Sequence, residues 1–292
     1  MKATVRCPGS CGELVQGTAD GLNFLVTCPI DLYSQVTVDL SPSGRTTPPA
    51  GPKTREAVRR TLAYLGIVVA DVAIEVKSEL PAGKGMASSS ADIAAACLAT
   101  ALAAGRTIEP AEICRIALDI EPTDGIFLSG ITQIDHVTGK LLRSLGTPPP
   151  ITIAVLDAGG EVDTIDFNQR SDLGSLNRRK EPEVQRALQL VEQGVRNGDA
   201  ALVGAGATLS ALANQPILCK PALERIIEIS RSYGAVGVNA AHSGTVLGVL
   251  FDSARAGGLS DCVDAICREC PEVRHFHTVR LVGGGLSIIG GS

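Results

Sequence analysis

The hydrophobic pattern of the first half of the chain predicts short strands that alternate with helices. β-Branched and partly alternating runs are typical of strands, which we expect at residues 2–6, 24–28, 33–40 and 72–76. Apolar positions three and four apart predict a helix over residues 54–65, with Gly66 as its end. A Gly-rich turn then leads into a long Ala-rich helix within residues 80–105. Pro110, near the first turn, favours a further helix over residues 109–120.

Three consecutive prolines, Pro148 to Pro150, divide the pattern. Because such a run continues neither a helix nor a central strand, we predict two domains, residues 1–148 and 149–292. Residues 126–145 are expected to pair as strands around Thr138 and Gly139. Beyond the prolines, we expect strands at 151–156, 245–251 and 274–282, and helices at 183–197, 199–213, 221–233 and 259–269. Interspersed strands and helices in both halves predict the α+β class.

Composition and charge restrict the class of protein. Hydrophobic residues make up 45% of the chain but aromatic ones only 3%, so we expect aliphatic cores. The net charge of −5, without a basic stripe, argues against a nucleic-acid partner. No apolar run reaches the roughly 18 residues of a membrane span, and the N-terminus has no signal-peptide pattern. We therefore expect a cytoplasmic protein without a membrane partner.

The nine cysteines have irregular spacing. Cys262, Cys267 and Cys270 are close in sequence, but they lie in a helix-like stretch with no matching second pair, which disfavours zinc. Buried apolar thiols are the better interpretation for the cysteines.

The most informative segment lies before the Ala-rich helix. Small residues between a strand and a helix start build an anion site, because glycines allow close approach and the first helical N–H groups are unpaired. The candidate phosphate-binding residues are Pro81, Gly83, Lys84, Gly85, Met86, Ala87, Ser88, Ser89 and Ser90. Ser89 followed by Asp92 also fits a capping box, which needs no ligand. That alternative does not account for the glycines, the lysine and the other two serines.

This segment is not a Walker A loop, since no G-x-x-x-x-G-K-[ST] occurs in the chain. Pro81 and the run from Gly85 to Ala91 instead resemble the central motif of the GHMP kinases, with Ala87 where glycine is usual. The Cys7–Gly17 segment is similar to the family's N-terminal motif, and Ser243-Gly244 to its third. The resemblance implies ATP as cofactor, bound between an N-terminal domain like ribosomal protein S5 domain 2 and a ferredoxin-like C-terminal domain.

The resemblance also implies a pair of carboxylates after the second helix. Glu121 is expected to bind Mg²⁺, with Ser89 as a further ligand, and Asp124 to contact the substrate hydroxyl. The spacing is shorter than usual in the family, so the two roles can be exchanged. Pro122 to Gly125 would also make a good turn without any catalytic role.

Several residues are candidates for binding a small-molecule substrate. Glu13, Asp31 and Asp135 can accept from a substrate ammonium, and His136 is either a binding residue or a turn residue. His275 and His277 share a strand face and have no third ligand nearby, so we expect half-exposed positions rather than a metal pair.

The segments around Cys7, Cys28, Glu121 and Asp135 look most like the GHMP kinases that phosphorylate L-threonine for adenosylcobalamin synthesis. L-Threonine or a related hydroxy amino acid is then the expected substrate. Homoserine kinase is the nearest alternative, and a non-catalytic nucleotide-binding regulator on the same fold is an alternative of another class. The oligomeric state stays open, with a homodimer as one option.

Overall fold

The computed structural model describes residues 1–292 except 42–49, 70, 160–171, 243 and 292. The strands are β1 (Lys2–Ala19), β2 (Leu22–Asp39), β3 (Ala73–Ser78), β4 (Ile131–Ile134), β5 (Leu142–Gly146), β6 (Ile151–Asp157), β7 (Gly237–Ala240), β8 (Val246–Asp252), β9 (Arg274–Arg280) and β10 (Ser287–Gly291). The helices are α1 (Pro52–Tyr64), α2 (Ser88–Ala103), α3 (Pro110–Leu118), α5 (Leu173–Asn197), α6 (Ala200–Ala213), α7 (Leu223–Ser232), α8 (Leu259–Glu269) and the 3₁₀ helix η1 (Ser253–Gly258).

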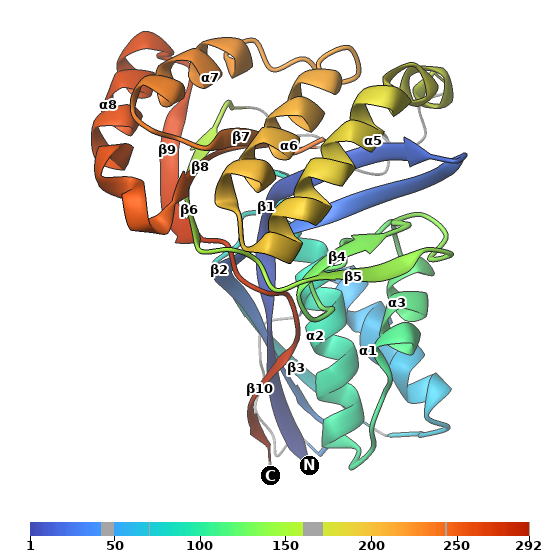
Figure 1. Ribbon diagram of the computed structural model, residues 1–292. Coiled ribbons are helices and arrows are strands. Elements are labelled where there is room, and N and C mark those ends of the chain that lie inside the picture. The colour runs from blue at the N-terminus through green and yellow to red at the C-terminus, as the bar shows by residue number, and fades with distance from the viewer. Residues whose placement is uncertain (42–49, 70, 160–171, 243, 292) are drawn as a thin grey trace.

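One sheet runs through both halves of the molecule. In the described part of the chain it has ten strands in the order β5-β4-β2-β1-β7-β8-β6-β9, with β10 paired to β1 and β3 paired to β2. Helices α1 to α3 lie beside the half that contains both termini, and α5 and α6 cover the other half (Figure 1). Since β1 and β2 pass through both halves and β10 returns to β1, the sheet joins the two predicted domains, whose boundary at residue 148 stays a prediction.

The long hairpin of β1 and β2 is the centre of this arrangement. Its turn consists of Asp20 and Gly21, both with positive φ (51° and 76°), which matches the twist of a tight antiparallel hairpin. The pairing register of β1 shifts between Pro8 and Gly9, between Ser10 and Glu13, and again after Glu13. Bulges of this kind bend a strand and redirect side chains. The Cys-Pro-Gly motif therefore lies inside a bulged strand, and its irregular register sets the direction of Glu13.

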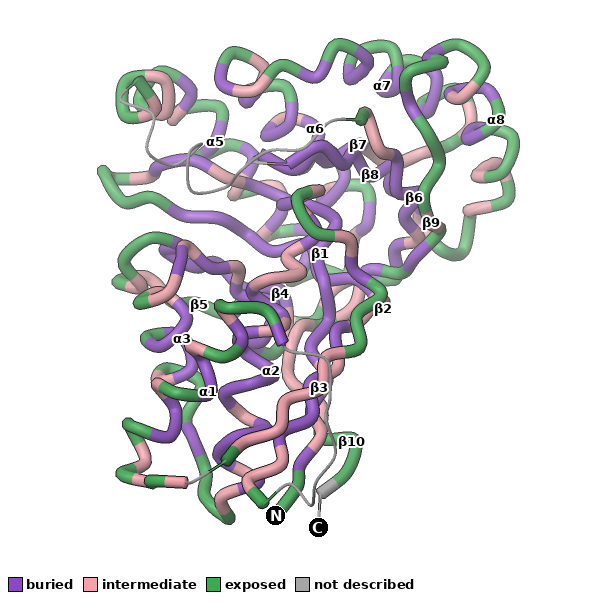
Figure 2. The backbone as a smooth tube through the Cα atoms, turned by 180° about the vertical axis from the view of Figure 1, so that it is seen from behind, coloured by how far each residue is buried: buried purple, intermediate pink, exposed green. Residues whose placement is uncertain are grey.

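Three hydrophobic clusters fill the spaces between the sheet and the helices. Buried positions follow β1, β2 and α2 through the middle of the molecule (Figure 2). Apart from Phe24 and Phe251, the largest fully buried side chains are aliphatic, as the composition predicted. Seven of the nine cysteines are buried, whereas Cys219 is exposed and Cys267 is partly exposed, so the expectation of buried thiols is wrong for these two.

Most predicted elements are present, and the differences have physical causes. Helix α5 begins at Leu173, ten residues earlier than expected, because it continues through Pro182. Its buried face, which includes Lys180 and Val184, lies on either side of the proline, so packing against the sheet offsets the missing hydrogen bond. Strands β7 and β10 were not predicted. None of the described helices has the combination of length and apolar sequence that crossing a membrane would need.

Candidate functional site

The loop between β3 and α2 presents the start of a helix to open space. Gly83, Gly85 and Ala87 all have positive φ, at 72°, 82° and 56°, and Ala87 is the N-cap of α2. The first backbone bond of the helix runs from the Ala91 N–H to the Ala87 carbonyl, at 2.9 Å. The N–H groups of Ser88 to Ser90 precede that bond and have no partner within the helix. Unpaired N–H groups at a helix start are suited to an anion, and the helix dipole strengthens that preference, so we call this the predicted anion site.

The other two glycine-containing segments hold this loop in place. The Ser10 N–H donates to the Met86 carbonyl at 3.0 Å, and the Gly12 N–H donates to the Gly85 carbonyl at 3.2 Å. From the far side, a Cβ on Gly244 would lie 2.4 Å from Gly85 Cα, so only glycine fits there. Gly244 therefore supports the loop without lining its cavity. Ser243 lies outside the described residues.

The capping-box alternative is not realised. Helix α2 has no side-chain cap at its N-terminus. The Asp92 carboxylate instead accepts a hydrogen bond from the Ser34 hydroxyl of β2. Burial raises the pKa of Asp92, the Ser34 hydrogen bond lowers it, and the nearby Glu121 raises it further. Asp92 is thus part of an acidic group beside the loop.

A cavity of about 410 Å³, here called the loop cavity, lies over the start of α2. Four carboxylates line it: Glu13, Asp92, Glu121 and Asp124. Lys53, at the start of α1, also lines the cavity and pairs with Glu121. Among the predicted phosphate-binding residues, the cavity is lined by Gly83, Gly85, Met86, Ala87, Ser88, Ser89 and Ser90. An acidic cavity beside an anion site is suited to a phosphate ligand that arrives with a cation.

Asp124 is the most unusual carboxylate of the loop cavity. Its backbone N–H donates to the Ser90 hydroxyl at 3.2 Å, which ties it to the start of α2. Its Oδ1 atom is buried without a hydrogen-bond partner among the described residues. Burial, then Glu13, then Glu121 raise the pKa of Asp124 to about 8. A carboxyl with a buried, unused oxygen and a pKa near neutrality has the properties of a general base.

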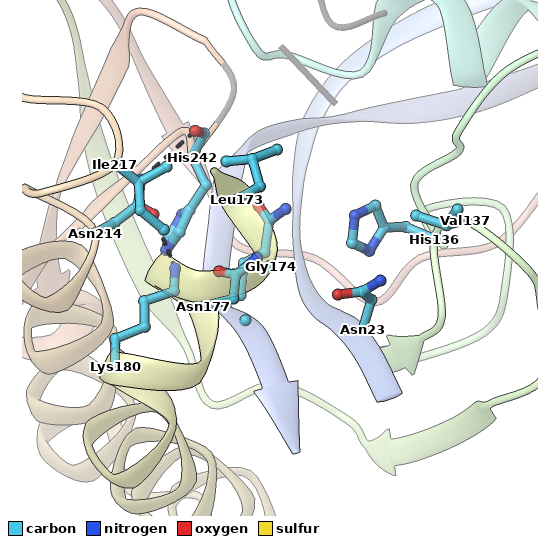
Figure 3. Close-up of a pocket in the computed structure, with 12 residues that line it drawn as sticks. Asn23, His136, Val137, Leu173, Gly174, Asn177, Lys180, Asn214, Ile217 and His242 are labelled. Carbon is cyan, nitrogen blue, oxygen red and sulfur yellow. Dashed lines mark hydrogen bonds between the residues drawn. The ribbon is translucent and has the colours of Figure 1, made fainter. Parts of the chain in front are cut away.

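A second cavity, of about 260 Å³, lies where α5 faces the hairpin, and we call it the α5 cavity. Lys180, Asn214 and His242 lie together on one side of it, and Asn23 and His136 lie on the other (Figure 3). The remaining lining residues are Gln16, Gly17, Val137, Leu173, Gly174, Asn177 and Ile217.

Glu13 connects the two cavities. It lines the loop cavity, and its Oε2 atom accepts from the backbone N–H of His242 at 2.8 Å and contacts His242 Nδ1 at 3.2 Å. His242 Nδ1 also lies 2.9 Å from the Ala240 carbonyl, and two acceptors around one nitrogen place the proton there. The ring Nε2 then accepts from the Ser210 hydroxyl at 3.1 Å. This network holds the Glu13 carboxylate in one orientation.

Two of the predicted acidic residues are used elsewhere. Asp135 accepts from the N–H groups of Val137 and Thr138 and from the Thr138 hydroxyl, so it stabilises its own turn. Burial raises the pKa of Asp135, but these hydrogen bonds outweigh it and leave the pKa below its usual value. Asp31 accepts from the Arg280 N–H at 2.7 Å and lines neither cavity.

The remaining predicted residues divide between the cavities and their surroundings. His136 lines the α5 cavity, where its Nδ1 is buried and has no hydrogen-bond partner among the described residues. Lys84 forms an ion pair with Asp157 at 3.0 Å, and neither Lys84 nor Pro81 lines the loop cavity. His275 is exposed and His277 partly exposed on β9, as expected. Within the described ranges, no three histidine, cysteine or acidic side chains lie close enough together to hold a metal ion by themselves.

Sequence reasoning missed several residues that line the cavities. Lys53 precedes the predicted first helix, and Lys180 precedes the predicted start of α5, so neither belonged to a motif. His242 lies directly before Ser243 in the third glycine-containing segment, and that position was the one available signal for it.

Comparison with known proteins adds an independent result. The family described as "GHMP kinases N terminal domain" matches residues 53–130, and "GHMP kinases C terminal" matches residues 173–269. An L-threonine kinase of Salmonella typhimurium is 32% identical over 295 residues, which covers 98% of this chain and 95% of that protein.

Solved structures agree at the level of the fold. A homoserine kinase from Cytophaga hutchinsonii superposes with a TM-score of 0.70 at 18% identity, covering 99% of this chain and 97% of that one. A protein solved in complex with MVAPP, AMPPCP and magnesium superposes with a TM-score of 0.70 at 14% identity, covering 100% and 99%. The predicted α+β fold is therefore confirmed.

Proposed function

The chain belongs to the GHMP kinase family, and on that premise we propose that it transfers the γ-phosphoryl group of ATP to the hydroxyl of L-threonine. The products are O-phospho-L-threonine and ADP. Membership of the family supports a kinase over the alternative of a non-catalytic regulator. Similarity to an L-threonine kinase over nearly the whole chain supports the choice of substrate. The proposal includes a cytoplasmic reaction that serves the aminopropanol linker of adenosylcobalamin.

The observation that carries the proposal is the position of Asp124. Its unpartnered Oδ1 is buried in the loop cavity, and its backbone is bound to Ser90 at the anion site. A hydroxyl bound there lies next to both a proton acceptor and the site for the phosphates. The hydroxyl oxygen forms a bond to the γ-phosphorus while the bond from that phosphorus to the bridging oxygen breaks. ADP leaves with the electron pair, and Asp124 takes the hydroxyl proton.

The donors around the anion site fit Mg²⁺, which prefers carboxylate, hydroxyl and phosphate oxygens. Glu121 and Asp92 present carboxylates to the loop cavity, and Ser89 presents a hydroxyl at the start of α2. When bound with ATP, Mg²⁺ would neutralise the phosphate charge and lower the pKa of Asp124. Lys53, which pairs with Glu121, would then be available to a phosphate oxygen.

Glu13 is the carboxylate best placed for the substrate ammonium. The other two candidates, Asp31 and Asp135, are held by Arg280 and by the Thr138 turn. Glu13 lines the loop cavity together with Asp124, and His242 holds it from behind. The ammonium and hydroxyl groups of threonine are on adjacent carbons, so two neighbouring carboxylates can bind them at once.

The test is ADP release by the purified protein with ATP and Mg²⁺. L-Threonine, L-homoserine, L-serine, mevalonate and galactose are compared, and each is repeated with Asp124→Asn. Asp119→Asn is the matched control, because Asp119 is exposed at the end of α3 and pairs with Arg60 and Arg115. Selective turnover of L-threonine that Asp124→Asn removes and Asp119→Asn retains supports the proposal. A preference for homoserine would contradict the substrate assignment.

A further inference from the structure

The α5 cavity contains chemistry that phosphoryl transfer does not use. Lys180 is buried in its wall, 7% exposed, and donates to the Asn214 side-chain oxygen at 2.8 Å. Its other two ammonium hydrogens have no hydrogen-bond acceptor within the described part of the chain. Two further polar atoms of the same wall are buried without a partner among the described residues, the amide oxygen of Gln16 and Nδ1 of His136. Unsatisfied buried groups are uncommon in folded proteins, so these atoms are open to an ordered water or a ligand.

We propose that the α5 cavity binds the amino-acid head group of the substrate, with the α-carboxylate on Lys180 and the α-ammonium between the Gln16 amide oxygen and Glu13. This inference rests on the proposed function, because it places the remainder of the substrate whose hydroxyl lies at Asp124. The ligand class is a zwitterionic α-amino acid with a side-chain hydroxyl.

The polar groups of the cavity match a zwitterion. A buried ammonium such as Lys180 is stabilised by an anion, and a carboxylate fits that requirement. The Gln16 oxygen only accepts hydrogen bonds, so it fits an ammonium. His136 is neutral because burial lowers its pKa more than Glu13 and Asp135 raise it, and a neutral ring can donate to a carboxylate or accept from an ammonium.

The charged groups also follow the order of groups in the substrate. Glu13 influences the pKa of both Lys180, in the α5 cavity, and Asp124, in the loop cavity. Threonine carries its carboxylate and ammonium on the α-carbon and its hydroxyl on the next carbon. Lys180, Glu13 and Asp124 would then bind the three groups in turn. A cavity of about 260 Å³ lies just below the usual range of about 300–1,000 Å³, which suits a small metabolite.

Lys180 is held in position by a network of its own. Asn214, at the end of α6, accepts from the ammonium through its side-chain oxygen, and its amide group donates to the His242 carbonyl at 3.5 Å. His242 in turn donates its backbone N–H to Glu13. The groups proposed for the carboxylate and the ammonium are therefore linked through two residues, which favours a single spacing between them.

The experiment compares two acceptors in the wild type and in Lys180→Met, which keeps a flexible apolar stem. The acceptors are L-threonine and 1-amino-2-propanol, which lacks the carboxylate. A hydrogen bond to a charged group contributes about 1.5–3 kcal/mol, so we expect kcat/KM for threonine to fall by about 10- to 100-fold. Turnover of 1-amino-2-propanol should change little. Lys77→Met, on the exposed face of β3, is the matched control and should leave both acceptors unaffected.

A second variant tests the other end of the head group. Gln16→Leu should lower kcat/KM for L-threonine more than kcat/KM for 2,3-dihydroxybutyrate, in which a hydroxyl replaces the ammonium. Thermal unfolding of each variant separates loss of folding from loss of binding. Equal losses for both acceptors in folded Lys180→Met would overturn the inference.

Direct binding separates this inference from the proposed function. Calorimetric titration of L-threonine into the protein with a non-hydrolysable ATP analogue needs no turnover. Binding that Lys180→Met removes would support the head-group site even if threonine is not phosphorylated, which would refute only the proposed function. Failure of the wild type to bind any hydroxy α-amino acid would overturn the inference itself.

Discussion

The loop cavity and the α5 cavity share the Glu13–His242 contact but differ in charge. The loop cavity has four carboxylates and one lysine, and that lysine is paired with Glu121. The α5 cavity is lined by Lys180, two neutral histidines and several amides. A cavity rich in carboxylates needs cations to be occupied, whereas a buried lysine needs an anion. This difference supports the proposal that phosphates with their metal bind in the loop cavity and the substrate head group in the α5 cavity.

The two cavities also differ in how the chain builds them. Most of the loop cavity comes from residues 82–92 and 121–124, two compact stretches. The α5 cavity is lined by residues from β1, β2, α5 and three loops. Variants in the first cavity should therefore alter catalysis and metal use, and variants in the second should alter substrate binding.

The largest effect is expected at Asp124. Asp124→Asn removes the proton acceptor and should lower kcat by about 10²- to 10⁴-fold, with a much smaller change in KM for threonine. Steady-state ADP release over a range of threonine concentrations measures both constants. An increase in KM alone would show that Asp124 binds substrate and would remove the catalytic difference between the two cavities.

Glu13 lines the loop cavity and contacts His242 in the wall of the α5 cavity, so Glu13→Gln should affect both catalysis and substrate binding. We expect KM for threonine to rise by about 10- to 100-fold, since a charge-assisted contact to the ammonium is lost. Because Glu13 also raises the pKa of Asp124, the acid limb of the kcat/KM profile should move to lower pH. A pH profile from 5 to 9 checks this, and an unshifted limb would contradict the electrostatic link.

Glu121→Gln should act mainly on metal binding, although Glu121 also makes the smallest of the three contributions that raise the pKa of Asp124. We expect the Mg²⁺ concentration for half-maximal activity to rise by about tenfold or more, with little change in KM for threonine. Titration of Mg²⁺ at fixed ATP measures this, with the exposed Glu109→Gln as control. An unchanged Mg²⁺ requirement would indicate that Asp92 or Asp124 is the metal ligand instead.

The pKa of Asp124 also predicts how stability depends on pH. The folded protein keeps the proton up to about pH 8, whereas an unfolded aspartate loses it near 3.8. The folded state therefore binds more protons between these values, and the contribution of Asp124 to stability falls as pH rises through that window, by at most about 1.4 kcal/mol per pH unit. Urea unfolding of the ligand-free protein at pH 5, 7 and 9 measures this. The free energy of unfolding should fall less with rising pH in Asp124→Asn than in the wild type. The same pH dependence of the free energy of unfolding in both proteins would refute the raised pKa of Asp124.

The smallest effect is expected at Ala87, the N-cap of α2 in the left-handed region. That conformation costs a non-glycine residue about 1–2 kcal/mol, and glycine gains flexibility in the unfolded state. Ala87→Gly should therefore stabilise the protein by no more than about 1 kcal/mol, measured by urea unfolding. Ala99→Gly, buried in the middle of α2, is the control and should destabilise it. Stabilisation by both variants would show that the left-handed conformation of Ala87 is not the cause.

Local sequence patterns were sufficient to predict those features that depend on contacts between neighbouring residues. The Gly- and Ser-rich turn before α2 and the carboxylates after α3 were both predicted, because a helix start and a helix end are determined mainly by neighbouring residues. Aliphatic cores were predicted from the lack of aromatic residues. The pattern misplaced the start of α5, because proline predicts a break that packing around Pro182 overrides.

The sequence by itself determined the glycine- and serine-rich loop before α2, the candidate base at Asp124 and the order of most elements. Only the tertiary structure decided which of three candidate carboxylates lines the loop cavity, since in the sequence Asp31, Asp135 and Glu13 are all acidic residues beside strands or turns. The bulges of β1 direct Glu13 toward His242, which lies 229 positions further along the chain. The carboxylate of Asp31 instead accepts a hydrogen bond from Arg280, and that of Asp135 accepts from the Thr138 turn. Lys180 acquires a role for the same reason, because burial beside Asn214 and His242 depends on contacts that no local pattern encodes.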